Sequence, residues 1–167
     1  MESANKVLYK LIKQGSPLAK SITLEEMPNL ISSLRRRLNL SEEDLDVSPS
    51  SLKTLEASLI QLYKKGSFVI DESEKLSVVR EIAGYIGQVL LLHANGELEP
   101  LGTLLSTHVV FNNVVMFKEG KRKVIPKINY SLGNLAAVSL DKIESGKKPN
   151  IYKYYLNAKK RVFVENV

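Results

Sequence analysis

Apolar residues in the first 95 positions recur at the three- and four-residue spacing of amphipathic helices. Glycine or an Asn-Gly pair follows three of these runs, where a helix ends readily because these residues adopt left-handed backbone. Ser48 before Pro49 is a suitable N-cap, and Thr23 with Glu26 has the spacing of a capping box. The pattern predicts four helices: Ala4–Gln14, Pro28–Leu38, one from Ser48 to Gly66, and one from Asp71 or Ser73 to Asn95.

After Gly96 the pattern changes to segments rich in Val, Thr and Phe, which favour strands. We expect three or so antiparallel strands between Glu97 and Pro126, with turns at Asn112-Asn113 and Glu119-Gly120. Helical spacing then returns in two segments, Ser131–Glu144 and Pro149–Phe163, the second with Ile151, Tyr154, Ala158 and Val162 facing inward. Residues 1–167 are therefore predicted to form a single α+β domain: a helical N-terminal half packed on a small antiparallel sheet, with two C-terminal helices.

Two glycines lie inside the fourth predicted helix, at Gly84 and Gly87, beside Ala83. An interior glycine costs about 1 kcal/mol relative to alanine, so the pair needs a compensating interaction. Small residues three apart lie on one side of a helix and let another element approach closely. We predict a structural role for both glycines, in a central helix that another helix or the sheet crosses.

The composition excludes several kinds of chemistry. The 167 residues include no cysteine, which rules out disulfides, thiol catalysis and cysteine metal sites. No apolar run reaches the roughly 18 to 20 residues of a membrane span, and residues 1–20 alternate lysine with apolar residues, unlike a signal peptide. We expect a cytoplasmic protein without a membrane span.

Candidate catalytic residues are few. His93 and His108 are the only histidines, and they could share a metal ion or a catalytic proton with Glu81, Glu97 or Glu99. No metal-ligand spacing connects them, so ordinary surface or core histidines are the simpler interpretation. Neither a phosphate-binding glycine motif nor a GxSxG motif is present. We expect no enzyme activity, no metal and no cofactor.

Basic residues concentrate in the last third of the chain, where residues 118–167 hold twelve Lys/Arg against four Asp/Glu. Such an excess attracts acidic proteins or nucleic acid, although a solvated lysine-rich surface has the same composition. Gly84-Tyr85-Ile86-Gly87 matches the GxxG of nucleic-acid-binding KH domains, but its central residues are apolar. The predicted basic binding face consists of Lys121, Arg122, Lys123 and Lys127 near a hairpin, and Lys153, Lys159, Lys160 and Arg161 on the last helix.

Two segments together resemble a pattern in small bacterial α+β proteins of unknown function, some of them in immunity-like settings. The first is a D-hydrophobic-S-x-x-S-L helix start at Asp46–Leu52, and the second is a YxGxV helix at Tyr85–Val89 followed by a strand. The resemblance covers roughly Asp44 to Pro100, and Leu98 or Glu99 stands where those proteins often have tryptophan. It implies an α+β fold and a bacterial or phage source, and it assigns no catalytic residue.

These observations favour a non-catalytic protein-binding module, such as an immunity protein, an inhibitor or an accessory subunit, whose basic face meets an acidic protein partner. The alternative is a nucleic-acid-binding accessory protein that uses the basic C-terminal third. An enzyme for a small molecule is a third interpretation, for which the sequence offers no site residues.

Overall fold

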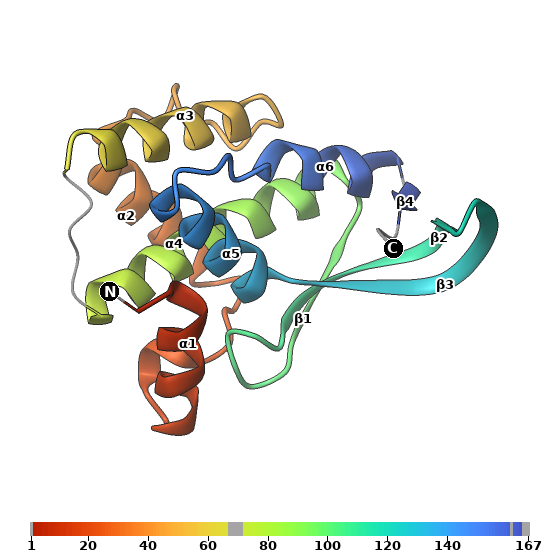
Figure 1. Cartoon of the computed structure of the whole chain (residues 1–167), viewed down its shortest axis with the longest axis horizontal. Helices are drawn as coiled ribbons and strands as arrows, with labels where there is room; N and C mark the ends of the chain where they lie inside the picture. Colours follow the sequence, from red (N-terminus) through yellow and green to blue (C-terminus); the bar gives the residue numbers. More distant parts are fainter. Residues whose placement is uncertain (1, 67–71, 161, 165–167) are drawn as a thin grey trace.

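The computed structural model describes residues 2–66, 72–160 and 162–164, and it confirms the predicted α+β class. Helices occupy the N-terminal half, a sheet follows, and two further helices come near the C-terminus (Figure 1). The elements are α1 (Ala4–Lys13), the 3-10 turn η1 (Pro17–Ala19), α2 (Met27–Leu38), α3 (Ser51–Lys64), α4 (Glu72–His93), β1 (Glu97–Pro100), β2 (Thr107–Lys118), β3 (Lys121–Ser131), α5 (Leu132–Glu144), α6 (Ile151–Lys160) and β4 (Val162–Val164).

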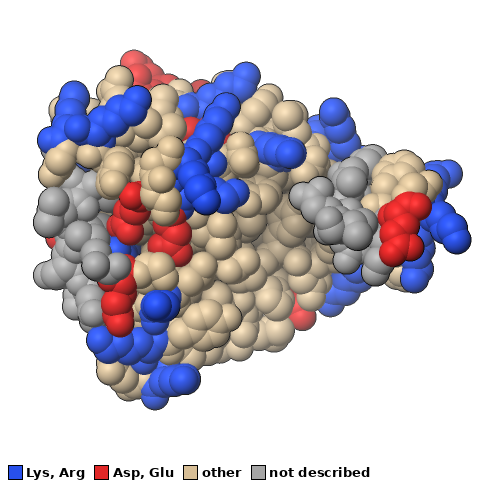
Figure 2. All heavy atoms as spheres, viewed as in Figure 1, with Lys and Arg blue, Asp and Glu red and all other residues tan. Residues whose placement is uncertain are grey.

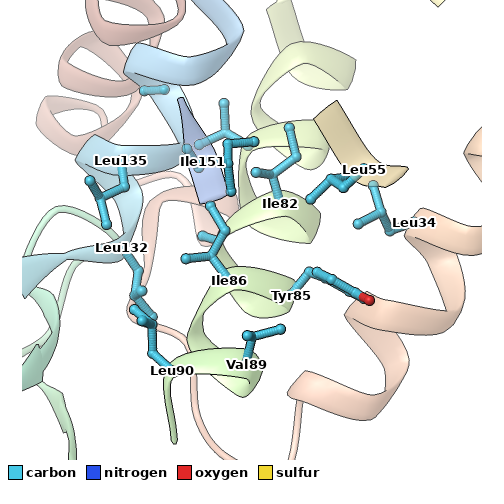
Figure 3. Packing of buried hydrophobic residues seen from close by; sticks show 14 of the residues in the cluster. Leu34, Leu55, Ile82, Tyr85, Ile86, Val89, Leu90, Leu132, Leu135 and Ile151 are labelled. Atoms are coloured by element: carbon cyan, nitrogen blue, oxygen red, sulfur yellow. The ribbon is translucent and has the colours of Figure 1, made fainter. Parts of the chain in front are cut away.

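Helix α4 is the centre of the fold, as its nearly continuous apolar pattern predicts. Its side chains point toward α2 on one side and toward α5 on the other (Figure 3). Ile82, Tyr85 and Val89 are fully buried. One cluster of buried apolar residues includes members from each of the helices α1 to α6 and from β2, so α4 connects the helical half to the sheet.

The two glycines of α4 have the predicted structural role. A Cβ added at Gly84 would lie 3.0 Å from the Leu30 side chain of α2. A Cβ added at Gly87 would lie 2.7 Å from Leu132 of α5 and 3.1 Å from Met27 of α2. Both contacts are closer than ordinary van der Waals packing, so the absence of side chains lets α2 and α5 approach the α4 backbone.

The sheet has four strands in the described residues, and β2 is its central strand. Strands β1 and β3 pair with β2 antiparallel, and the short β4 pairs with β2 in parallel. Val109 and Phe111 face the helices and are fully buried. The β2–β3 hairpin projects beyond the helices (Figure 1), and β4 pairs with β2 along Val115–Phe117, close to the hairpin loop.

Two sequence predictions for the sheet were wrong. The expected turn at Asn112-Asn113 lies inside β2, where Asn112 pairs with Lys127 and the flanking Val and Phe residues favour a strand. The sheet also continues past Pro126, which lies within β3. Strand β3 pairs only with β2 among the described residues, and an edge strand tolerates a proline because one side of it needs no donor.

The predicted helix Pro149–Phe163 is also shorter than expected. Helix α6 ends at Lys160, and Val162 pairs with Val115 of β2 as the first residue of β4, so it does not continue the inward helical face. Strand β1 covers only the Thr107–Val110 part of β2, which leaves an open edge farther along. A Val-Phe-Val segment favours strand geometry, and that edge supplies its backbone partners.

Local capping agrees in part with the sequence signals: the residues that directly precede α2 and α3 are Glu26 and Ser50, and the predicted capping side chains act in the turns just before them. Thr23 and Glu26 form the reciprocal capping box, because the Thr23 N–H donates to Glu26 Oε2 at 3.1 Å and the Glu26 N–H to Thr23 Oγ1 at 3.4 Å. Ser48 Oγ accepts the N–H of Ser51 at the start of α3. Ser131 caps α5 by accepting the Asn134 N–H.

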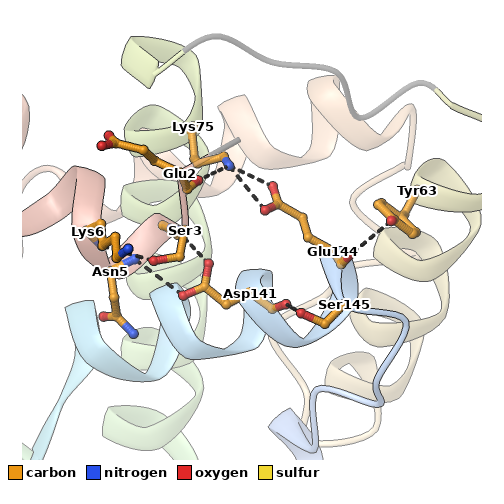
Figure 4. A network of polar contacts seen from close by, with 10 residues as sticks. Glu2, Ser3, Asn5, Lys6, Tyr63, Lys75, Asp141, Glu144 and Ser145 are labelled. Carbon is orange, nitrogen blue, oxygen red and sulfur yellow. Dashed lines mark hydrogen bonds and ion pairs between the residues drawn. The ribbon is translucent and has the colours of Figure 1, made fainter.

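A polar network fastens the N-terminal helix to α5 (Figure 4). The Asp141 carboxylate accepts the N–H of Ala4 at 2.5 Å and that of Asn5 at 3.3 Å, and so caps α1 from a distant part of the chain. Nearby, the buried Lys75 ammonium of α4 forms an ion pair with Glu144 of α5 and donates to the Glu2 carbonyl. Helices α1, α4 and α5 are therefore joined by polar contacts as well as by apolar packing.

The β1–β2 connection is held against the segment that precedes α2. The Leu104 N–H donates to the Ala19 carbonyl at 2.8 Å, and Lys20 forms a β-bridge with Thr103. The fully buried Thr107 hydroxyl accepts the Ile22 N–H and donates to the Thr103 carbonyl. These bonds fix the backbone of the connection close to the start of α5, which packs on it at Gly133.

Candidate functional site

The β2–β3 hairpin presents the first group of predicted basic residues. Its loop is Glu119-Gly120, confirming the second predicted turn, and both residues have positive φ (51° and 74°), as a two-residue hairpin turn requires. Lys121, Arg122 and Lys123 follow directly and are exposed. Figure 2 shows Lys and Arg gathered at the outer end of the hairpin, with few acidic side chains beside them.

The two faces of this hairpin differ in chemistry. Residues directly opposite each other in a ladder share a face, so Phe117 pairs with Arg122 and Val115 with Val124 on the same side. Val124 is 61% exposed, and Val115 and Phe117 are half-buried. Lys121 and Lys123 lie on the opposite face. We call Phe117, Glu119, Lys121, Arg122, Lys123 and Val124 the hairpin tip.

Lys127 does not belong to the hairpin tip. It lies farther down β3, where its ammonium forms an ion pair with Glu99 of β1 at 3.2 Å. Both side chains are largely solvated, so this pair adds little stability. With Glu97 and Asn112 they line a shallow hollow of about 260 Å³ on the sheet. The carboxylates there offset the lysine, so this predicted residue is not part of a strongly basic surface.

The basic residues of α6 are also separated from one another. Lys159 donates to the His93 carbonyl at 3.0 Å and so satisfies the C-terminal end of α4. Lys160 is exposed, and Lys153 lies seven residues earlier, roughly 10 Å along the helix axis. Arg161 lies outside the described residues. The structure thus distributes the predicted basic residues over several places.

Lys153 lies instead in a groove between α3 and α6 that the sequence did not reveal. The groove has a volume of about 520 Å³, a rim of Lys53, Lys148 and Lys153, and apolar lining from Ile60, Tyr152 and Leu156. We call it the α3–α6 groove. Lys53 comes from a helix about one hundred positions earlier in the sequence, so linear charge patterns could not join it to Lys153.

The histidines are placed on separate elements. His93 ends α4, and His108 lies in β2 opposite Glu99 of β1, whose carboxylate is paired with Lys127. Glu81 is buried and accepts two hydrogen bonds from the Arg37 guanidinium, at 2.9 and 2.8 Å, so it serves as a structural ion-pair partner. Within residues 2–66, 72–160 and 162–164, no three acidic or histidine side chains form a group able to hold a metal.

The two segments of the resemblance contact each other through Tyr85. Its hydroxyl accepts the Val47 N–H at 3.0 Å and lies 2.5 Å from Ser51 Oγ. Val47 has φ of 63°, a left-handed conformation that a β-branched residue rarely adopts, and this bond helps to hold it. Burial raises the pKa of the Tyr85 hydroxyl. The D-x-S-x-x-S-L and YxGxV segments therefore act structurally, joining the start of α3 to α4.

Replacing Tyr85 by phenylalanine is expected to destabilise the fold by about 1 to 2 kcal/mol, because the Val47 N–H and Ser51 hydroxyl lose a buried partner. Urea unfolding followed by circular dichroism measures this change. Tyr63→Phe, which removes a hydroxyl donating to the exposed Glu144 carbonyl, is the matched control and should cost less. Equal stability of Tyr85→Phe and the parent chain would show that the network is dispensable.

Comparison with known proteins gives no relative, since no family model, no curated protein and no solved structure matches the chain. The resemblance to bacterial α+β proteins stays a prediction. In the part of the chain that the structure describes, no helix has both the length and the apolar character needed to cross a bilayer.

Proposed function

We propose that the chain is a non-catalytic protein-binding module, of the immunity, inhibitor or accessory-subunit kind, that presents the hairpin tip to an acidic surface of a partner protein. The observation that carries the proposal is the combination found there: exposed Arg122 shares one face with a Val124 side chain that is 61% exposed, and exposed Lys121 and Lys123 lie on the other face. A protruding hairpin reaches a partner without obstruction from the helices (Figure 1).

The mixture of residue types at the hairpin tip favours protein over nucleic acid. Arginine and aromatic residues are enriched in protein interfaces, where an apolar centre is surrounded by a polar rim. Arg122 shares its face with Phe117 and Val124, which offer nothing to a phosphate backbone. Lysines on the other face supply the long-range attraction that guides an acidic partner to the tip.

Nucleic acid is the alternative that the same hairpin supports. A two-stranded ribbon fits the major groove of DNA, and basic side chains at its end neutralise phosphates. The two functions differ in salt response, because each neutralised phosphate releases condensed counterions and steepens the loss of affinity with salt. Filter binding of duplex DNA and of RNA at low and physiological salt therefore separates them.

Charge reversal at the tip, as Lys121→Glu, Arg122→Glu and Lys123→Glu together, is expected to slow association with the partner by on the order of tenfold. Folding should be unaffected, since exposed substitutions usually change stability by within about 0.5 kcal/mol each. The partner is obtained by capture on the immobilised parent chain from the cell that produces it, and rates are measured by surface plasmon resonance.

The matched control reverses three exposed lysines elsewhere, Lys6, Lys13 and Lys20, and changes the net charge equally. Association of the control at the parental rate assigns the effect to the hairpin tip. If both variants slow association equally, the effect comes from overall charge and the hairpin tip is not the contact surface. Tight, salt-sensitive retention of DNA or RNA by the parent chain would contradict the protein-binding proposal and support the alternative.

A further inference from the structure

The α3–α6 groove has the construction of a second binding site, separate from the hairpin tip. The two helices lie side by side in Figure 1, away from the outer end of the hairpin. Ile60, Tyr152 and Leu156 are half-buried and line the groove, whereas Lys53, Lys148 and Lys153 are exposed around it. An apolar lining beneath a cationic rim suits a ligand that is apolar on one side and negatively charged on the other.

The polar groups inside the groove are already positioned by the fold. Glu56 is buried, and its Oε1 accepts the Tyr152 N–H at 2.9 Å, in the first turn of α6. This carboxylate therefore caps α6, and it offsets part of the rim charge. Lys53 Nζ lies 4.5 Å from the centre of the Tyr152 ring, a cation–π contact that holds the ammonium over the apolar lining. The groove therefore has three lysines on its rim and one carboxylate, that of Glu56, which is already bonded to Tyr152. Its net charge is positive.

The shape of the groove favours a peptide over a small anion. A volume of about 520 Å³ is within the range of small-molecule sites, but the groove lies open between two helices at the surface. Sites for small ligands bury most of the ligand surface, which an open groove cannot do. A peptide helix can rest its apolar side in such a groove and extend its charged side toward the rim.

We propose that the α3–α6 groove binds an acidic amphipathic helix of a partner protein, with apolar side chains against Ile60 and Leu156 and carboxylates paired with Lys53, Lys148 and Lys153. This site is independent of the hairpin tip. A partner could contact the chain at either place or at both, and contact at both would raise the overall affinity through effective concentration.

The test uses two fluorescein-labelled peptides of identical composition on the full chain. One places leucine at i, i+3, i+4 and i+7 with glutamate elsewhere, and the other has the same residues in scrambled order. We expect fluorescence anisotropy to show at least about tenfold tighter binding of the amphipathic peptide, a difference of about 1.4 kcal/mol. Equal binding of the two peptides would show that charge alone acts, and no binding of the amphipathic peptide would also overturn the proposal.

Variants of the chain locate the site. Lys53→Gln, Lys148→Gln and Lys153→Gln together should weaken the amphipathic peptide about tenfold, whereas Lys6→Gln, Lys13→Gln and Lys20→Gln together should leave it nearly unchanged. Leu156→Gln, a milder change of the lining, should also weaken binding, and circular dichroism checks its fold. Equal losses in the two lysine variants would contradict the assignment to the groove.

Reversal of charge at the hairpin tip distinguishes this proposal from the proposed function. The hairpin variant should bind the amphipathic peptide within about twofold of the parent chain, because its residues lie outside the groove. A large loss in the hairpin variant, with none in the groove variant, would place the acidic helix at the hairpin tip and overturn the groove assignment.

Discussion

Gly133→Ala is expected to lower the free energy of unfolding by about 3 kcal/mol, although alanine is the better helix former. Gly133 is the second residue of α5, and an added Cβ would lie 2.5 Å from the Leu104 carbonyl oxygen and 2.8 Å from its carbonyl carbon. Real Cβ atoms essentially never approach other heavy atoms so closely, so the helix or the β1–β2 connection must move. Urea unfolding followed by circular dichroism measures the loss.

The size of the effect follows from what the added methyl group meets. The added methyl group meets the backbone of Leu104. This backbone is held in place because the Leu104 N–H donates a hydrogen bond to the Ala19 carbonyl at 2.8 Å. The Ser131 hydroxyl, at the start of α5, also donates a hydrogen bond to the Leu105 carbonyl at 2.6 Å and so holds the β1–β2 connection against α5. Gly84→Ala is the matched control, because its Cβ would meet only side-chain atoms of Leu30, at 3.0 and 3.1 Å, and no backbone atom. We expect a cost below about 1 kcal/mol there, and similar costs at both glycines would refute this explanation.

Glu144→Ala is expected to cost about 3 kcal/mol, because it leaves the Lys75 ammonium buried without an opposite charge. Lys75 is 2% exposed, and its Nζ lies 3.0 Å from one Glu144 oxygen and 3.1 Å from the other. The remaining bond to the Glu2 carbonyl, at 2.9 Å, does not replace the carboxylate. Thermal and urea unfolding at neutral pH report the change.

Removing the positive charge of Lys75 should destabilise the fold much less than removing its partner Glu144. Lys75→Met keeps the length of the side chain and replaces the ammonium by an apolar group, while Glu144, whose side chain is 17% exposed, can take up water. The double variant Lys75→Met/Glu144→Ala should therefore be more stable than Glu144→Ala alone. Additive effects of the two substitutions would mean that the pair is not coupled.

The helices could be predicted from the sequence because their signals are local. Apolar spacing located α1 to α5 to within a few residues, and the capping signals at Thr23 and Ser48 lie three to four residues before the starts of α2 and α3. The errors arise where partners are distant in sequence. Asn112-Asn113 has turn chemistry but pairs with β3, and Val162 continues a helical pattern but meets an open edge of β2.

The candidate sites were predictable to different degrees for the same reason. The basic residues of the hairpin tip are consecutive, so charge and a turn signal sufficed to find them. The α3–α6 groove joins Lys53 to Lys148 and Lys153, and only the packing of α3 on α6 brings them together. Gly133 gave no signal either, since its importance depends on a loop almost thirty residues earlier.

The hydrogen bonds between α1 and Asp141 of α5 affect how the chain folds during translation. Helix α1 leaves the ribosome before α5, and Asp141, which accepts the Ala4 N–H, follows 137 residues after Ala4. Until α5 has emerged, α1 lacks the Asp141 carboxylate at its first two N–H groups, Lys75 lacks Glu144, and the apolar surface of α4 lacks the packing of α5. Nascent chains at that stage expose apolar helices and are prone to aggregation. Translation interrupted before residue 141 should therefore yield a product that chaperones retain and proteases remove.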